Sequence, residues 1–265
     1  MQISKINEDI YRTTLPYKDI FTTVYTIRTP EGVVLFDAGS YDTDAREYIL
    51  PFLQAVSVRP EEVKYIFISH DHGDHAGGLK GLLPFLPEAC VVSRGAAIRE
   101  RCGQDCALLV PEDKDMLTSV LRVITIPGHT MDSMALLDLR SNIMVTGDCL
   151  QVYGIVGSQD WASNIRFPAE YLEALEKVRA IGADMIVTAH DYHPWGYRAD
   201  GREAVEQMID GCIAPMRRLE KLIRDNPEMD DAQIRQCYNS EPNAPTLRLG
   251  VVAAMRKAIA EDRIR

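Results

Sequence analysis

The sequence contains no apolar stretch of the length that a membrane-spanning helix needs, which is about 20 residues. Its first residues, Met1 to Asp9, are polar and of mixed charge, so the basic and then apolar pattern of a secretory signal is also missing. These two absences argue against an integral membrane protein and favour the cytoplasm as the location.

Positive charge is scarce. The 265 residues include 29 Lys and Arg against 39 Asp and Glu, which gives a formal net charge of −10. The lysines and arginines do not gather into the basic patch that a nucleic-acid backbone or an anionic membrane surface attracts. We therefore expect a small-molecule substrate as the partner, and neither nucleic acid nor a membrane.

Closely spaced cysteines are missing as well. No two of the six cysteines are separated by two residues, which is the spacing of thioredoxin-type and zinc-ribbon motifs. In a long chain without an export signal, reduced thiols explain an even number of cysteines better than disulfides do. We predict that Cys102 and Cys106 are surface-loop thiols and that Cys149 is a core thiol; the others are Cys90, Cys212 and Cys237.

The chain does have enough apolar material for a sizeable core. Hydrophobic residues make up 46% of the sequence and charged residues 26%, with no internal repeat and no low-complexity linker. Alternating and β-branched runs predict strands, and apolar residues at helical spacing predict helices. The expected strands are 3–11, 21–28, 33–36, 63–69, 90–93, 121–126, 133–139, 142–146 and 184–188, and the expected helices are 41–56 (interrupted by Pro51), 168–181, 203–224, 230–238 and 246–261.

Four of these strands lead to residues that can bind a metal. The strand 63–69 runs into His70, the strand 142–146 precedes Asp148, and the strand 184–188 precedes His190. A fourth strand, 121–126, reaches His129 through Pro127-Gly128. A sheet holds such residues rigidly while their side chains face a cleft between loops, so we expect a functional site there.

The densest of these places is the run His70-Asp71-His72-Gly73-Asp74-His75. Neutral imidazole and carboxylate are ligands for first-row metals that still leave a coordination position open for water. Structural zinc sites instead favour cysteine and close at four ligands. The run therefore predicts a catalytic metal site, with hydrolysis as the chemistry.

The H-x-H-x-D-H run, followed by Gly128-His129-Thr130, by Gly147-Asp148 and by a final His190, resembles the metallo-β-lactamase superfamily over about residues 20–193. The resemblance implies an α/β fold, a four-layer αββα sandwich with a helical C-terminal extension. We expect a catalytic domain of this type at 1–200 and a helical segment at 201–265 packed on the same domain, as the source of specificity or of a homodimer contact.

The resemblance also implies the ligands of two divalent metal ions, zinc first, with iron or manganese as alternatives. His70, His72 and His129 would hold the first ion, Asp74, His75 and His190 the second, and Asp148 would bridge both. Asp74 would also accept the proton of the attacking water. We name Tyr153 as a second catalytic candidate, able to donate to a substrate carbonyl or oxyanion.

Further candidates lie near these positions. Asp37 resembles the acidic residue that the superfamily keeps near its histidine loop, and a role in orienting a ligand follows from that. Tyr192, His193, Trp195 and Tyr197 follow His190, and whether they line the pocket stays open.

The predicted function is hydrolysis of a small-molecule ester, thioester or lactone by a binuclear metal centre. β-Lactam and phosphodiester hydrolysis are alternatives, because one fold serves many substrates. A different class is a mononuclear-iron oxidoreductase of the sulfur-dioxygenase kind, which would use only His70, Asp148 and either His129 or His72. His72 stands where the flavin-iron members of the superfamily carry Glu, which makes that branch a poor fit.

Overall fold

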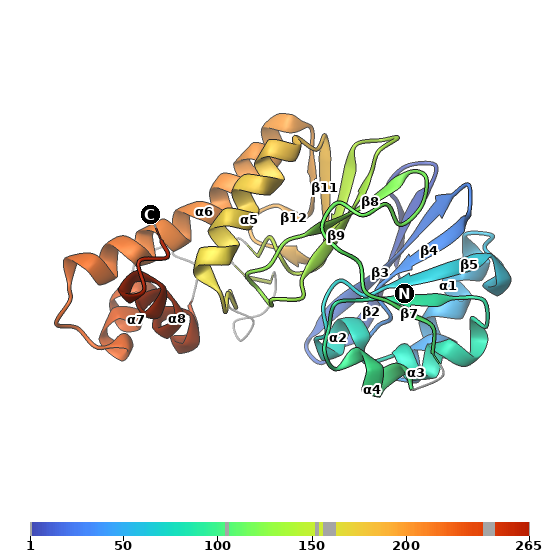
Figure 1. The fold of residues 1–265 in the computed structure, drawn as a ribbon, viewed down its shortest axis with the longest axis horizontal. Helices are drawn as coiled ribbons and strands as arrows, with labels where there is room; N and C mark the ends of the chain where they lie inside the picture. Colours follow the sequence, from blue (N-terminus) through green and yellow to red (C-terminus); the bar gives the residue numbers. More distant parts are fainter. Residues whose placement is uncertain (1, 104–105, 152–153, 156–162, 241–246, 265) are drawn as a thin grey trace. The chain divides into compact units, whose positions relative to one another are not determined.

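The computed structural model describes residues 2–103, 106–151, 154–155, 163–240 and 247–264 (Figure 1). The chain divides into two compact units, the first made of residues 1–125 and 134–140, the second of 126–133 and 141–265. The strands of the described residues form two sheets, one of seven strands and one of five. The fold is therefore mixed α/β, as predicted; the domain boundary expected after residue 200 stays a prediction.

The seven-stranded sheet belongs to the first unit and follows the chain order from β1 to β7. Its first four strands are antiparallel and its last four, β4 to β7, are parallel. The strands are β1 (Ile3–Lys5), β2 (Ile10–Tyr17), β3 (Ile20–Thr29), β4 (Gly32–Phe36), β5 (Val63–Phe67), β6 (Cys90–Val92) and β7 (Leu108–Leu109). The loop that follows the carboxyl end of the parallel strand β5 contains His70, one of the predicted metal ligands.

The chain forms two strands where we predicted one over residues 3–11. The side chain of Asn7 accepts hydrogen bonds from the backbone N–H groups of Asp9 (2.9 Å) and Ile10 (2.7 Å). An asparagine that bonds to its own following backbone closes a turn. The turn separates β1 from β2, and the two strands pair antiparallel.

Short helices pack on the seven-stranded sheet and share one apolar cluster with it, which includes Leu35, Ile66, Phe52 and Leu79. The helix predicted over 41–56 begins at Ala45 as a π-helical turn and continues as α1, and Pro51 lies in the first turn of α1, where its missing N–H is not needed. The helical elements are η1 (Ala45–Ile49), α1 (Leu50–Ala55), η2 (Pro60–Glu62), α2 (Gly73–Ala76), α3 (Leu79–Leu82), η3 (Leu83–Phe85) and α4 (Ile98–Cys102).

The first unit also contains the antiparallel pair β8 (Leu121–Thr125) and β9 (Met134–Asp138). The second unit contains β10 (Ile143–Thr146), which pairs parallel with β11 (Met185–Tyr192), and β12 (Gly196–Asp200), which pairs antiparallel with β11. We predicted only helices after Trp195, so β12 is a correction. The segment 196–200 is too short for its sequence alone to predict a strand, and it becomes one because it pairs with β11 in a hairpin.

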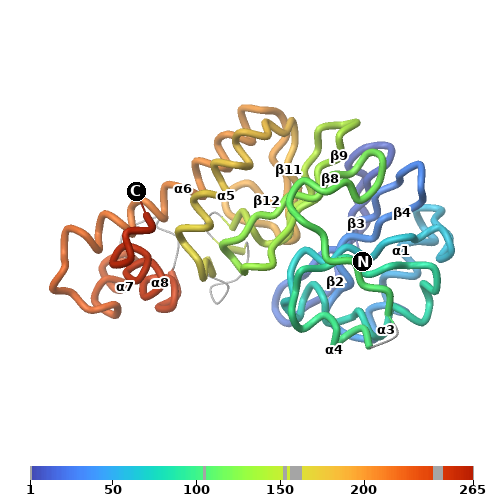
Figure 2. Tube along the Cα trace, viewed as in Figure 1, coloured from blue at the N-terminus to red at the C-terminus, as the bar shows by residue number. Residues whose placement is uncertain are grey.

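Helices make up most of the rest of the second unit, and Figure 2 follows their path along the chain. α5 (Pro168–Ile181) ends at Gly182, whose φ of +65° is left-handed, as the sequence predicted. α6 (Arg202–Asp225) packs on β11 and β12, and α7 (Asp231–Asn239) and α8 (Leu249–Ala260) follow it. Among the described helices, none is both long and apolar enough to cross a membrane.

Candidate metal centre

The first unit presents its candidate ligands on the loop and helix that follow β5. His70 comes three residues after the end of the strand and is 1% exposed. His72 stands immediately before α2, and α2 carries the buried side chains of Asp74 and His75. The turn requires Gly77, because a Cβ there would lie 2.1 Å from the backbone oxygen of Ser40. Local chain path therefore brings His70 and His75 together, with ring centroids 4.2 Å apart.

Asp37 orients this histidine loop. Its Oδ2 lies 2.7 Å from Nδ1 of His75, and its two oxygens accept hydrogen bonds from the backbone N–H (2.7 Å) and the hydroxyl (3.0 Å) of Ser69. The Ser69 hydroxyl in turn lies 3.0 Å from Nδ1 of His70. Burial raises the pKa of the Asp37 carboxyl, while His75 and Ser69 oppose that shift. Asp37 thus makes the contacts that we predicted for a residue that orients a ligand.

The second unit presents His129, Asp148 and His190. Asp148 follows β10 and is 6% exposed; its Oδ2 lies 3.7 Å from Nε2 of His129, and its Oδ1 lies 3.4 Å from Nε2 of His190. Each oxygen of this one carboxylate therefore faces a different imidazole. That arrangement suits a carboxylate that serves two ions, as the bridging role inferred from the sequence requires.

The position of His190 corrects one expectation. We predicted that its strand ends at Thr188, whereas β11 continues to Tyr192 and His190 lies inside it. The pairing of β11 with β12 shifts register between Val187 and Tyr192, and a strand irregularity of this kind can redirect a side chain. His190 is fully buried, with the ring of Tyr192 6.0 Å away.

His129 is held by residues that sequence reasoning missed. Its Nδ1 lies 2.8 Å from the backbone oxygen of Asn164 and 2.8 Å from the side-chain Nε2 of Gln151, whose Oε1 accepts a hydrogen bond from the Asn164 N–H (2.7 Å). A ring nitrogen cannot donate to the carbonyl and accept from the amide at once. Donation to the carbonyl fits a His129 that binds metal through Nε2. The only feature of the sequence that could have pointed to Gln151 is its position three residues after Asp148.

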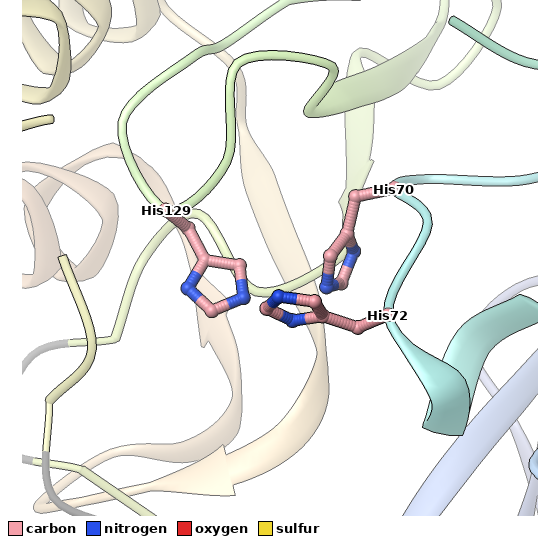
Figure 3. Close-up of side chains that lie close together, drawn as sticks. All are labelled: His70, His72 and His129. Carbon is pink, nitrogen blue, oxygen red and sulfur yellow. The ribbon is translucent and has the colours of Figure 1, made fainter. Parts of the chain in front are cut away.

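The ligand atoms gather into two groups, and within each group they all lie within 4.8 Å of one another. One group is His70, His72 and His129 (Figure 3). The other is Asp74, His75, Asp148 and His190, all buried. The sequence predicted the same two sets of ligands, with Asp148 as the bridge between them; here Asp148 falls in the second group, and which ion each residue binds stays a prediction.

The donor set fits divalent transition metals. Nδ1 of His70, of His75 and of His129 each contacts a hydroxyl, carboxylate or carbonyl oxygen of the protein. A ring whose Nδ1–H is so engaged presents an unprotonated Nε2, the form that a metal ion binds. Three imidazoles in one group, and two imidazoles with two carboxylates in the other, suit zinc, iron or manganese.

The remaining candidates divide. Tyr153 lies outside the described residues, so its catalytic role stays a prediction. Tyr192 is buried against His190, whereas His193 is exposed. None of the six cysteines, all of which lie in the described ranges, forms a disulfide, as predicted; Cys102 and Cys106 are half-buried rather than on the surface, because both pack against the core cluster of the first unit.

Comparisons with known proteins identify relatives of this chain. Residues 17–87 match the family model of the metallo-beta-lactamase superfamily. The beta-lactamase-like protein 2 homolog of Caenorhabditis elegans is 24% identical over 247 residues, which are 91% of this chain and 79% of that protein. The lactamase-like protein aptB of Emericella nidulans is 28% identical over 141 residues, and the match spans 50% of this chain but only 41% of the fungal protein.

A solved structure shows the same fold. The metallo-beta-lactamase family protein of Thermus thermophilus superimposes with a TM-score of 0.66 at 16% identity, over 97% of this chain and 95% of that one. The α/β fold of metallo-β-lactamase type predicted from the sequence is thereby confirmed.

Proposed function

Because the chain belongs to the metallo-β-lactamase superfamily, we propose that it is a binuclear metal-dependent hydrolase that acts on a small-molecule ester, thioester or lactone. The proposal includes two divalent ions, zinc first, and a small-molecule substrate with neither nucleic acid nor a membrane as partner. It also includes a cytoplasmic location.

One observation carries the binuclear part of the proposal. Seven ligand-type residues fall into two groups rather than one, and the two oxygens of Asp148 point to different imidazoles, His129 and His190. A mononuclear site would need only three or four of the seven. The other three or four would then be buried imidazoles and carboxylates with no metal to offset their burial.

The charge of the two groups supports hydrolysis. The group of His70, His72 and His129 contains only imidazoles, which bind a metal ion as neutral ligands, and the other group contains two carboxylates, Asp74 and Asp148. These two negative charges would balance one divalent ion and leave the charge of the second in excess, where negative charge develops on a substrate oxygen. Bound ions would supply Lewis-acid chemistry and lower the pKa of a coordinated water.

The residues of the chain orient the imidazoles and provide the groups that accept or donate a proton. Asp37 orients the imidazole of His75 directly and that of His70 through the Ser69 hydroxyl. The Asn164 carbonyl orients the imidazole of His129. We assign acceptance of the proton to Asp74, which is 8% exposed and whose Oδ2 lies 3.5 Å from Nε2 of His75. Tyr153 is our candidate for donation to the substrate oxygen.

A metal analysis combined with a substrate panel tests this function. We expect two zinc-like ions per chain and turnover of at least one ester, thioester or lactone, and we expect Asp74→Asn to abolish that turnover. A single iron per chain, with oxygen consumed on a persulfide substrate, would instead establish the oxidoreductase alternative. If the protein hydrolyses only β-lactams or phosphodiesters, the proposed metal centre stands and the proposed substrate class is wrong.

A further inference from the structure

The second unit contains a cavity of about 280 Å³ between the start of α5 and α8. We call it the α5–α8 pocket. Apolar groups form part of its wall, among them Met131, Phe167 and Ala258. Met131 is 53% exposed, so solvent or a ligand can reach this part of the wall. The pocket has room for a short carbon chain.

Three cations and two carboxylates also line the α5–α8 pocket. Arg263 pairs with Glu170 and lies 3.8 Å from Glu261, and Lys257 lies 3.8 Å from Glu261. Arg166 is exposed and, within the described ranges, makes no ion pair. The pocket therefore has one more cation than carboxylate, although the chain as a whole has a net charge of −10, and the guanidinium left over is that of Arg166.

The pocket is tied to a candidate metal ligand through the backbone. The carbonyl of Gly128 accepts hydrogen bonds from the N–H groups of Arg166 (3.0 Å) and Phe167 (2.9 Å), and Gly128 directly precedes His129. Met131 leaves the same loop two residues after His129. The segment 164–167 therefore both anchors His129, through the Asn164 carbonyl, and forms a wall of the pocket.

We propose that the α5–α8 pocket binds the carboxylate at the far end of the substrate's acyl chain, with Arg166 as the residue that recognises it. This inference rests on the proposed function and narrows it to substrates that carry a negative charge. A guanidinium matches a carboxylate with two parallel hydrogen bonds. Glu170 and Glu261 favour a singly charged group, because a dianionic phosphate would meet stronger repulsion from them.

Paired substrates test the proposal on the metal-loaded protein. The substrates are 4-nitrophenyl butyrate and the mono-4-nitrophenyl ester of glutaric acid, which differ by one carboxylate at the chain end. Arg166→Gln should raise KM for the glutarate ester about tenfold, the equivalent of about 1.4 kcal/mol, and leave kcat unchanged. KM for the butyrate ester should not change. Arg235→Gln, which removes an exposed arginine of α7, is the matched control.

A binding measurement separates this inference from the proposed function. Saturation-transfer NMR with monomethyl glutarate and uncharged dimethyl glutarate requires no turnover. Binding of the monoester that is lost in Arg166→Gln and kept in Arg235→Gln supports the pocket, even if no ester is hydrolysed and the proposed function fails. Binding that is equal in both variants, or undetectable in the parent protein, overturns the inference, as does an unchanged KM ratio of the two esters.

Discussion

Oδ2 of Asp37 lies 2.7 Å from Nδ1 of His75, and both side chains are fully buried. Asp37 adopts a left-handed backbone conformation, with φ of +65°, to reach this position. A non-glycine residue in that region carries a conformational cost, which the surrounding contacts must offset. The strained backbone of Asp37 thus places its carboxylate where it orients His75, a candidate metal ligand.

Asp37→Asn should therefore weaken metal binding. The amide keeps the shape of the side chain but loses the charge that raises the basicity of His75, and such changes typically cost about 10- to 100-fold in metal affinity. Competition with a chromogenic chelator measures the affinity. Asp44→Asn is the control, because Asp44 is also buried and accepts two backbone hydrogen bonds, from Ser40 and Tyr41. Equal affinity in the two variants would contradict a role for Asp37 at the metal.

Asp148→Asn should lower both metal content and turnover. If one carboxylate serves both ligand groups, its loss removes a ligand from each, and we expect a fall of about 100-fold or more in kcat/KM. Elemental analysis of the dialysed protein and the substrate panel measure the two effects. Asp184→Asn, on an exposed aspartate of the same unit, should change neither. A variant with full metal content and full turnover would refute the assigned site.

Removal of metal should lower the stability of the whole fold. Buried carboxylates and imidazoles gathered within 4.8 Å of one another repel or stay poorly solvated without an ion between them. A ligand at 1,000 times its Kd contributes about 4 kcal/mol. Calorimetry with and without chelator, followed by addition of zinc, measures the shift in Tm. The shift should be smaller in Asp148→Asn; a Tm that does not respond to chelation in the parent protein would count against a metal-dependent site.

Gly128→Ala should destabilise the protein by about 2 to 4 kcal/mol. The φ of Gly128 is +145°, and a Cβ there would lie 2.6 Å from Cα of Tyr171 in α5. Gly250→Ala is the matched control, because Gly250 lies in α8 with nothing within 4 Å of its added Cβ; that change should stabilise by up to about 1 kcal/mol. Denaturant unfolding of both variants decides, and equal stabilities would contradict the close approach at Gly128.

The candidate ligands could be found in the sequence because their types and their places after apolar runs are both visible there. His70, Asp148 and His129 follow strands that periodicity predicts. The side chains that orient them could not be found in the same way. Ser69 and Gln151 are ordinary polar residues whose contacts appear only when the chain has folded.

The errors in the fold have the same origin. β12 is recognisable only beside β11, and the turn at Asn7 depends on one side chain that bonds to its own backbone. His190 was placed beyond a strand end because the apolar run stops at Ala189, whereas pairing with the neighbouring strand carries β11 on to Tyr192. Periodicity predicts local structure, and long-range pairing decides where an element ends.

The anchor of His129 is a main-chain oxygen, that of Asn164. Every amino acid supplies this atom, so substitution at position 164 need not disturb the imidazole so long as the backbone keeps its course. If Arg166 recognises the substrate as we propose, changes of the side chains at 166 and 167 would alter the choice of substrate without moving His129. A comparison of residue identities alone would judge this segment dispensable.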